Sequence, residues 1–179
     1  MHKSISHITV LTIALMTLVS CNLNCGTNDK DTQAFNLKEQ LTQDGYVPIK
    51  IKKMPSGHLH LFGQLNGVDG NFVLDTGAGT TVIEKKNKEK FGMQTKATEN
   101  KATSAGGTDM QMQTSTQNAF NVGTLKLSNL KLMLLNLDHI NNAFERMGLE
   151  KVDGVIGTDI LTNNKAIIDY TNLILYLKH

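Results

Sequence analysis

The sequence predicts a mainly β fold with one or two short helices. Apolar and polar residues alternate along much of residues 46–179, which is the two-residue period of strands that bury one face. Turn dipeptides containing glycine separate these stretches, and only one longer segment has apolar residues at helical spacing. A chain of 179 residues with 40% hydrophobic content can bury the core of one domain and is short for two.

Residues 1–20 are expected to be a signal peptide. Lys3 precedes the apolar run ITVLTIALMTLV, which has the length of an export signal and is shorter than the roughly 20 residues of a membrane span. Residues 18–21, LVSC, resemble the lipobox of bacterial lipoproteins, and this resemblance implies lipidation of Cys21. It also implies a lipid-anchored protein of the bacterial cell envelope, periplasmic or at the cell surface. The alternative is an ordinary cleaved signal in which Cys21 is incidental.

Residues 21–45 are predicted to be a polar tether with a short amphipathic piece near Phe35, Leu37 and Leu41. If Cys21 carries lipid, Cys25 is the one remaining thiol, so no intrachain disulfide can form. The domain at 46–179 must then be stable through packing alone.

The first strands are expected at 46–54 and 58–65, joined as a hairpin by the turn Pro55-Ser56-Gly57. Asn66-Gly67 and Asp69-Gly70 are both dipeptides typical of tight turns. The second of them leads into NFVLD, an apolar strand that ends at Asp75. Small residues follow, in the order Thr-Gly-Ala-Gly-Thr-Thr, and they allow the backbone to turn sharply before the next β segment.

The second half continues the pattern. Residues 104–108, which include Gly106 and Gly107, are predicted to form the tip of a hairpin, and residues 120–137 two strands around Ser128-Asn129. Apolar residues at helical spacing predict a helix over 137–148. Thr158 is expected to cap a short second helix, and the chain is expected to end in a hairpin that turns at Thr171-Asn172.

Two segments, FVLDTGAGTTVI at 72–83 and GVIGTDIL at 154–161, resemble the two signatures of retropepsin-like aspartic proteases. The resemblance covers about residues 46–179 and implies a closed β-barrel of the acid-protease type and an aspartic endopeptidase. It assigns catalysis to Asp75, with Thr76 and Gly77 in the same loop, where the Thr76 hydroxyl bonds to the opposite loop. It also implies that Gly106 and Gly107 belong to a flap over the substrate.

The reaction of this family requires two carboxyl groups, because one takes a proton from the attacking water while the other, protonated, donates to the peptide carbonyl. The sequence contains one Asp-Thr-Gly. The second carboxylate is therefore expected from another copy of the chain, in a homodimer with two-fold symmetry. Asp153 is expected to be a turn residue, and Asp159 a charge that complements the N-terminus of a helix. Because Ala78 has no hydroxyl to donate to the dyad, a working pH less acid than that of pepsin is expected.

Other partners are not indicated. The net charge is +2 and the basic residues are scattered, so nucleic acid is not expected to bind. His58 and His60 alternate on one strand, but no third ligand accompanies them, so both are predicted to face solvent and neither metal nor cofactor is expected. The alternatives to a peptidase are a catalytically silent domain that binds peptides or proteins and a purely structural lipoprotein. Asp75 would then only close a turn. The sequence does not define the substrate sequence, the membrane face or any removal of a propeptide.

Overall fold

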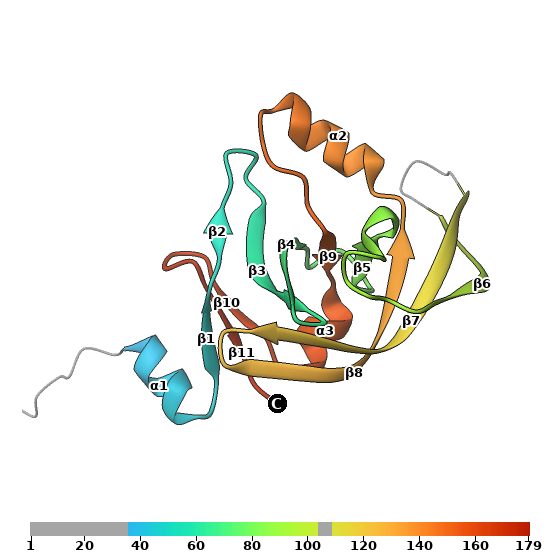
Figure 1. Cartoon of the computed structure of the whole chain (residues 1–179). Helices are drawn as coiled ribbons and strands as arrows, with labels where there is room; N and C mark the ends of the chain where they lie inside the picture. The colour runs from blue at the N-terminus through green and yellow to red at the C-terminus, as the bar shows by residue number, and fades with distance from the viewer. Residues whose placement is uncertain (1–35, 104–108) are drawn as a thin grey trace, which may run out of the picture. The chain divides into compact units, whose positions relative to one another are not determined.

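The computed structural model describes residues 36–103 and 109–179 (Figure 1). In chain order, its elements are α1 (Leu37–Gln43), β1 (Val47–Lys50), β2 (Lys52–Lys53), β3 (Leu59–Leu65), β4 (Val68–Leu74), β5 (Val82–Glu84), the 3₁₀ helix η1 (Lys85–Asn87), β6 (Thr95–Thr103), β7 (Asp109–Val122), β8 (Leu125–Leu135), α2 (Asp138–Arg146), β9 (Gly154–Ile156), α3 (Thr158–Asn163), β10 (Ile167–Asp169) and β11 (Ile174–Leu177). The predicted fold class, mainly β with short helices, is confirmed.

The larger sheet closes into a barrel. Its strand order is β2-β3-β4-β9-β5-β8-β7-β6, and an additional pairing of β3 with β7 joins the ring β3-β4-β9-β5-β8-β7. The strands β2 and β6 extend beyond this ring. A closed ring leaves no free sheet edge within it, so the backbone of the barrel strands is satisfied internally.

The main hydrophobic core fills this barrel. Leu61, Phe72, Ile83 and Leu134, which come from four different barrel strands, are at most 1% exposed. The Phe72 ring packs edge-on against Phe120 with ring centroids 5.2 Å apart. Burial of apolar side chains from every strand stabilises the closed form, at about 25 cal/mol per Å² removed from water.

A second, three-stranded sheet has the order β1-β11-β10. The hairpin predicted at the C-terminal end is confirmed as β10 and β11. The hairpin predicted at 46–65 is only partly right, because β2 pairs with β3 whereas β1 pairs with β11. The chain crosses between the sheets at Ile51, which is buried and donates its amide hydrogen to the carbonyl of Leu173.

The two predicted turns at 66–70 have different outcomes. Asn66 and Gly67 have left-handed φ values of 51° and 84° and connect β3 to β4, as predicted. Asp69-Gly70 is not a turn, because both residues lie within β4. The close packing of the Phe72 ring against the backbone requires glycine at position 70, because a Cβ atom there would lie 2.5 Å from the ring.

The turn predicted at Ser128-Asn129 is also wrong. The strand β8 continues through these residues, and the reversal occurs earlier, at Gly123-Thr124, where Gly123 has φ 57°. Asn129 has a left-handed φ of 56° beside a register shift between β7 and β8. The dipeptide therefore marks an irregularity in a strand pair.

The helix predicted at 137–148 is confirmed as α2. The helix α3 begins at Thr158, but Gly157 occupies the N-cap position and the Thr158 hydroxyl donates to the Ala78 carbonyl at 3.1 Å, so the predicted capping role is wrong. The helix α1 occupies part of the segment predicted as a tether, and its Leu41 is buried within the compact unit that begins at Asn36.

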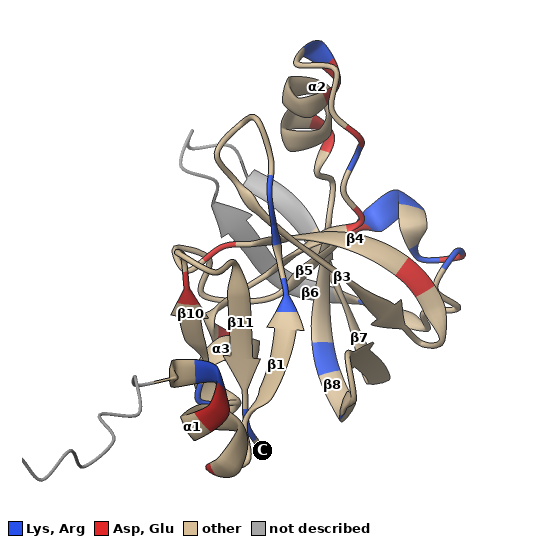
Figure 2. Ribbon diagram, turned by 90° about the vertical axis from the view of Figure 1, so that its left-hand side faces the viewer, with Lys and Arg blue, Asp and Glu red and all other residues tan. Residues whose placement is uncertain are grey.

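Basic and acidic residues are interspersed over the described elements (Figure 2). Of the helices in the described ranges, none combines the length and the apolar character needed to cross a bilayer. The predicted signal peptide, Cys21, Gly106 and Gly107 lie outside the described residues. The two arms of the predicted flap hairpin, β6 and β7, do pair on either side of residues 104–108.

Candidate active site

Asp75 lies at the carboxyl end of β4, beside the end of β9. The two strands run parallel, with Leu74 opposite Ile156, and the Asp75 amide donates to the Ile156 carbonyl at 3.1 Å. The Asp75 side chain is exposed at this edge. The strand pair thus fixes the backbone of Asp75 while its carboxylate remains accessible to a ligand.

The turn after Asp75 orients this carboxylate. The amide of Gly77 donates to Asp75 Oδ1 at 2.8 Å, and the amide of Ala78 donates to the Asp75 carbonyl at 3.3 Å. Thr76 is exposed in the same turn. One backbone amide of the turn therefore holds one oxygen of the Asp75 carboxylate.

A buried threonine connects this loop to the start of α3. Thr81 is 1% exposed, its amide lies 2.9 Å from both carboxylate oxygens of Asp159, and its hydroxyl donates to Asp159 Oδ1 at 2.6 Å. The Thr81 hydroxyl also accepts from the Gly157 amide at 3.0 Å. These bonds hold the loop of Asp75 against the second signature. The sequence motif contains Thr81, but its pattern gave no reason to pair it with Asp159.

Gly157 allows this close contact. A Cβ atom at Gly157 would lie 2.6 Å from the carbonyl carbon of Thr80 and 2.8 Å from the carbonyl oxygen of Ala78. The Ala78 carbonyl accepts from the Thr158 amide at 2.7 Å. The glycine of the second signature is thus required because two backbone segments touch there.

The later aspartates have structural partners. Asp159 lies in the first turn of α3, as expected, and in addition binds Thr81. Asp153, predicted to be a turn residue, lies at a bend before β9 and has further partners: it is 9% exposed and accepts from the Asn71 amide, the Asn87 side chain and Lys90 Nζ at 2.9, 2.7 and 2.7 Å. Asp153 thus joins the start of β9 to β4 and to the segment at 87–90.

Asp169 is the third of these later aspartates. It accepts hydrogen bonds from the side chain and amide of Asn172 and from the amide of Thr171, and these bonds, the Asn172 side chain first, lower the pKa of Asp169. Asp169 thus closes the β10–β11 turn and does not serve as a partner for Asp75.

A small pocket of about 200 Å³ adjoins Asp75. His58, Leu59, Leu74, Ile168 and Tyr170 lie around it, together with Gly57 and Thr76. Among the residues that the structure describes, Asp75 is the only carboxylate in this lining. Tyr170, which follows β10, is 64% exposed. Within the described ranges, one chain therefore presents a single acid in a shallow pocket, to which β10 contributes Ile168.

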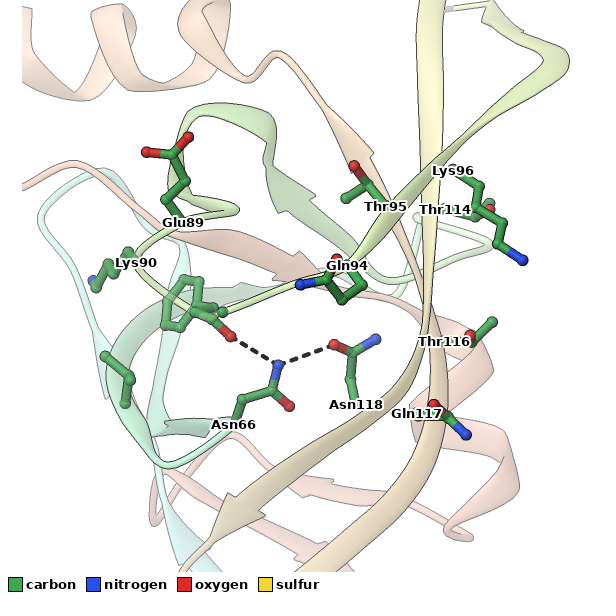
Figure 3. Close-up of a pocket in the computed structure, with 13 residues that line it drawn as sticks. Asn66, Glu89, Lys90, Gln94, Thr95, Lys96, Thr114, Thr116, Gln117 and Asn118 are labelled. Atoms are coloured by element: carbon green, nitrogen blue, oxygen red, sulfur yellow. Dashed lines mark hydrogen bonds between the residues drawn. The ribbon is translucent and has the colours of Figure 1, made fainter.

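A larger pocket of about 810 Å³ lies at the base of the β6–β7 hairpin (Figure 3). Its floor is closed by Asn66, which donates to the Phe91 carbonyl at 2.9 Å and to Asn118 Oδ1 at 3.0 Å. The rest of its lining is mostly amides, hydroxyls and lysines. Asp75 does not line this pocket, so the larger pocket is separate from the candidate active site.

The prediction that both histidines of β3 face solvent is wrong for His60. His58 is exposed and lies 3.0 Å from the Ser56 hydroxyl, whereas His60 is fully buried. Its Nδ1 lies 2.9 Å from Asn71 Oδ1, and its Nε2 has no hydrogen-bond partner among the described residues. Burial, only partly offset by the Asn71 bond, lowers the pKa of His60. Within the described ranges, no three potential ligand side chains gather as a metal site.

The barrel and the loop at Asp75 define a protein with the retropepsin-like fold. A crystal structure of a retropepsin-like aspartic protease from Rickettsia conorii matches with a TM-score of 0.50 and 23% identity, covering 74% of this chain and 91% of that chain. Two further matches have 15% identity and TM-scores of 0.47: EIAV protease complexed with the inhibitor HBY-793 (62% of this chain, 90% of that chain), and the retroviral protease-like domain of Ddi1 from Leishmania major (67% and 87%).

A family model described as aspartyl protease matches residues 62–160, more than half of the 179 residues. The chain belongs to the aspartyl protease family. No curated protein sequence matches it. The matched range begins in β3 and ends in α3, so it contains both signatures and the Thr81–Asp159 connection.

Proposed function

We propose that this protein is a membrane-anchored aspartic endopeptidase that is active as a homodimer. The observation that carries the proposal is Asp75: an exposed carboxylate, oriented by the Gly77 amide, at the end of a strand in a chain of the aspartyl protease family. Paired with its copy, it would share a proton, because two adjacent carboxylates do not both ionise. The ionised group takes a proton from water, and the protonated group donates to the carbonyl oxygen of the peptide.

The second carboxylate is expected from another copy of the chain because no other acid among the described residues lines the pocket at Asp75. Strand β10 is an edge of the three-stranded sheet, and its Ile168 lines this pocket. An unpaired edge is suited to pairing with another strand. Two copies joined along β10 by a two-fold axis would form one six-stranded sheet and bring the two Asp75 loops near the axis. The exposed Thr76 hydroxyls are expected to bond between the loops.

Residues 1–20 are proposed as a lipoprotein signal peptide, with lipid attached at Cys21. Anchoring in the bacterial envelope confines the chains to two dimensions and raises their local concentration, which favours pairing. Incorporation of a labelled fatty acid into the wild type and not into Cys21→Ser tests the anchor separately from catalysis.

The catalytic proposal is tested by incubating the full chain, in mild detergent, with a mixed peptide library at acid to neutral pH and at several protein concentrations. Asp75→Asn should lower cleavage by at least about a hundredfold, because it removes the proton-transferring group. The matched control is Asp69→Asn, an exposed aspartate on the same strand, which should cleave like the wild type.

Cleavage that depends on Asp75 and rises more steeply than linearly with protein concentration supports a dimeric peptidase. Cleavage that is equal in Asp75→Asn contradicts the assignment of Asp75. A folded wild type that binds peptides, does not cleave them and stays monomeric would instead favour the second candidate, a catalytically silent peptide- or protein-binding lipoprotein, which the single acid in the pocket permits.

A further inference from the structure

An open groove lies on the outer face of strands β3, β4 and β7. Its volume is about 720 Å³, and it shares no described residue with the pocket at Asp75. This volume is in the range of small-molecule sites. The side chains that line the groove are those of Phe62, Gln64, Asp69, Asn71, Asn121 and Asp153. The groove therefore combines one aromatic ring with amides and carboxylates.

Phe62 presents its ring to this groove. The Phe62 side chain is 50% exposed, whereas Leu61, on the opposite face of β3, is fully buried in the core. Gly63 has no room for a side chain, because a Cβ atom there would lie 2.9 Å from the Phe120 ring. Beside Phe62, the groove is thus lined by the backbone of Gly63. The exposed aromatic ring can be covered by a flat apolar surface of a ligand.

Three polar side chains form a row across the sheet, two residues further along β3. Gln64 lies directly opposite Asp69 of β4 on one side and Asn121 of β7 on the other. Gln64 Nε2 donates to Asp69 Oδ1 at 3.0 Å, so Asp69 orients the Gln64 amide. Two residues of a strand span roughly 7 Å. The row of polar groups and the Phe62 ring are therefore separated by a distance that one sugar ring can bridge.

The charges of the groove favour a neutral ligand. Among the described residues, no lysine or arginine lines it. Asp153 is paired with Lys90 at 2.7 Å. Asp69 binds the neutral amide of Gln64, and within the described ranges no basic side chain pairs with it. An anionic ligand would meet this negative charge with no cation in the lining to offset it.

We propose that this groove binds a neutral oligosaccharide, with one sugar ring packed on Phe62 and its hydroxyl groups bound by the side-chain amides of Gln64 and Asn121. A sugar ring has an apolar face of C–H groups, which suits an aromatic ring, and an edge of hydroxyl groups. An amide both donates and accepts hydrogen bonds, as a hydroxyl group does. This second site does not depend on cleavage at Asp75.

An extended peptide suits this groove less well than a sugar. A peptide that binds as an added strand needs a free sheet edge, where it can pair with unused backbone groups. Strand β4 is paired with β3 and β9, and β3 is paired with β4 on one side and with β2 and β7 on the other. The groove thus offers a ligand side-chain groups and a ring face, which is the chemistry that recognises a sugar.

The experiment titrates three neutral trisaccharides, of glucose, of mannose and of N-acetylglucosamine, into the full chain in a detergent without a sugar head group. Trigalacturonate is the charged comparison. At least one neutral trisaccharide should bind, with a Kd at least about tenfold below that of trigalacturonate. Phe62→Leu keeps an apolar side chain without the ring and should raise this Kd about tenfold, whereas Phe62→Tyr keeps the ring and should bind like the wild type.

Asn121→Ala is the second variant and should raise the Kd about fivefold, because it removes a hydrogen-bonding amide. The matched control is Met147→Leu, a 52% exposed apolar residue outside the groove, which should leave the Kd unchanged. Failure of all three neutral trisaccharides to bind at millimolar concentration overturns the proposal. So does an equal Kd for the wild type, Phe62→Leu and Asn121→Ala. Self-association that Phe62→Leu abolishes, without sugar binding, would instead assign the groove to a second copy of the chain.

Discussion

His60 shows that the alternation of residues along a strand does not by itself determine which side chains are buried. It alternates with the exposed His58, yet it is fully buried, 5.7 Å from the ring of Phe144 on α2 between ring centroids. Alternation gave no warning, because β3 has buried residues on both faces near its start. The residue that buries it belongs to a helix more than 80 positions away, and sequence periodicity does not predict which face a distant helix covers.

The burial of His60 predicts a loss of stability in acid. The pKa of His60 is lowered in the folded protein, so the unfolded chain binds the proton more tightly, and stability falls as pH drops below about 6.5. The charged groups that act on it are His58 and Lys52, which lower its pKa further, and Glu150, which raises it. His60→Gln should therefore lose less unfolding free energy than the wild type between neutral pH and about pH 5, because it removes the group whose pKa differs between the folded and unfolded states.

Urea denaturation at both pH values measures this difference. His139→Gln, which changes an exposed histidine, is the control and should follow the wild type. If the wild type and His60→Gln lose the same unfolding free energy, the burial of a neutral imidazole is not the cause of acid sensitivity.

At the scale of elements, the two signatures form one structure because their backbones touch. Residues 75–81 and 156–159 are joined by the bonds of Thr81 with Asp159 and Gly157 and of Thr158 with Ala78. The sequence identified both segments, since each combines an apolar strand with glycine. It did not identify their contact, because nothing in either pattern states that Thr81 and Asp159 face each other. Likewise, Gly70 resembles a turn glycine in sequence, but glycine is needed there because the Phe72 ring leaves no room for a Cβ atom.

This contact predicts different effects for two glycines near each other. Gly157→Ala places a Cβ atom 2.6 Å from the Thr80 carbonyl carbon, where backbone must move, and should destabilise the protein by about 1–3 kcal/mol and lower activity. Gly79→Ala has no heavy atom within 4 Å of the new Cβ and should be nearly neutral. Thermal denaturation and peptide cleavage measure both variants. Equal Tm values for the two would show that the loop and the second signature are not in rigid contact.

At the scale of the whole molecule, the fold class, the final hairpin and the helix at 137–148 were predictable because each depends on local periodicity and turn chemistry. The assignment of β1 to a different sheet from β2 was not, since it depends on the pairing of Val47 with Leu177, at opposite ends of the domain. The same holds for the reversal at Gly123-Thr124. Strand pairing over long sequence distances decided that Asp69-Gly70 and Ser128-Asn129, both plausible turn dipeptides, lie within strands.

The proposed dimer makes a prediction at the same scale. Tyr170 lies beside β10 at the pocket of Asp75 and is 64% exposed, so Tyr170→Lys should raise the dimer dissociation constant at least about tenfold through charge repulsion and lost apolar contact. Phe62→Lys, at a 50% exposed residue of β3, is the control and should leave association unchanged. Sedimentation at several concentrations measures both. Unchanged association of the Tyr170 variant would place the interface elsewhere.

The three-stranded sheet has a mechanical consequence. A pull on the N-terminal side of the domain passes through α1 into β1, whose four residues pair with β11 outside the closed ring of barrel strands. The first strand to bear this load therefore belongs to the three-stranded sheet, before the chain crosses at Ile51 into β2. From β11 the load reaches β10, which borders the pocket of Asp75. For the anchored chain proposed above, tension would load the β1–β11 pairs first, one strand away from the wall of the Asp75 pocket.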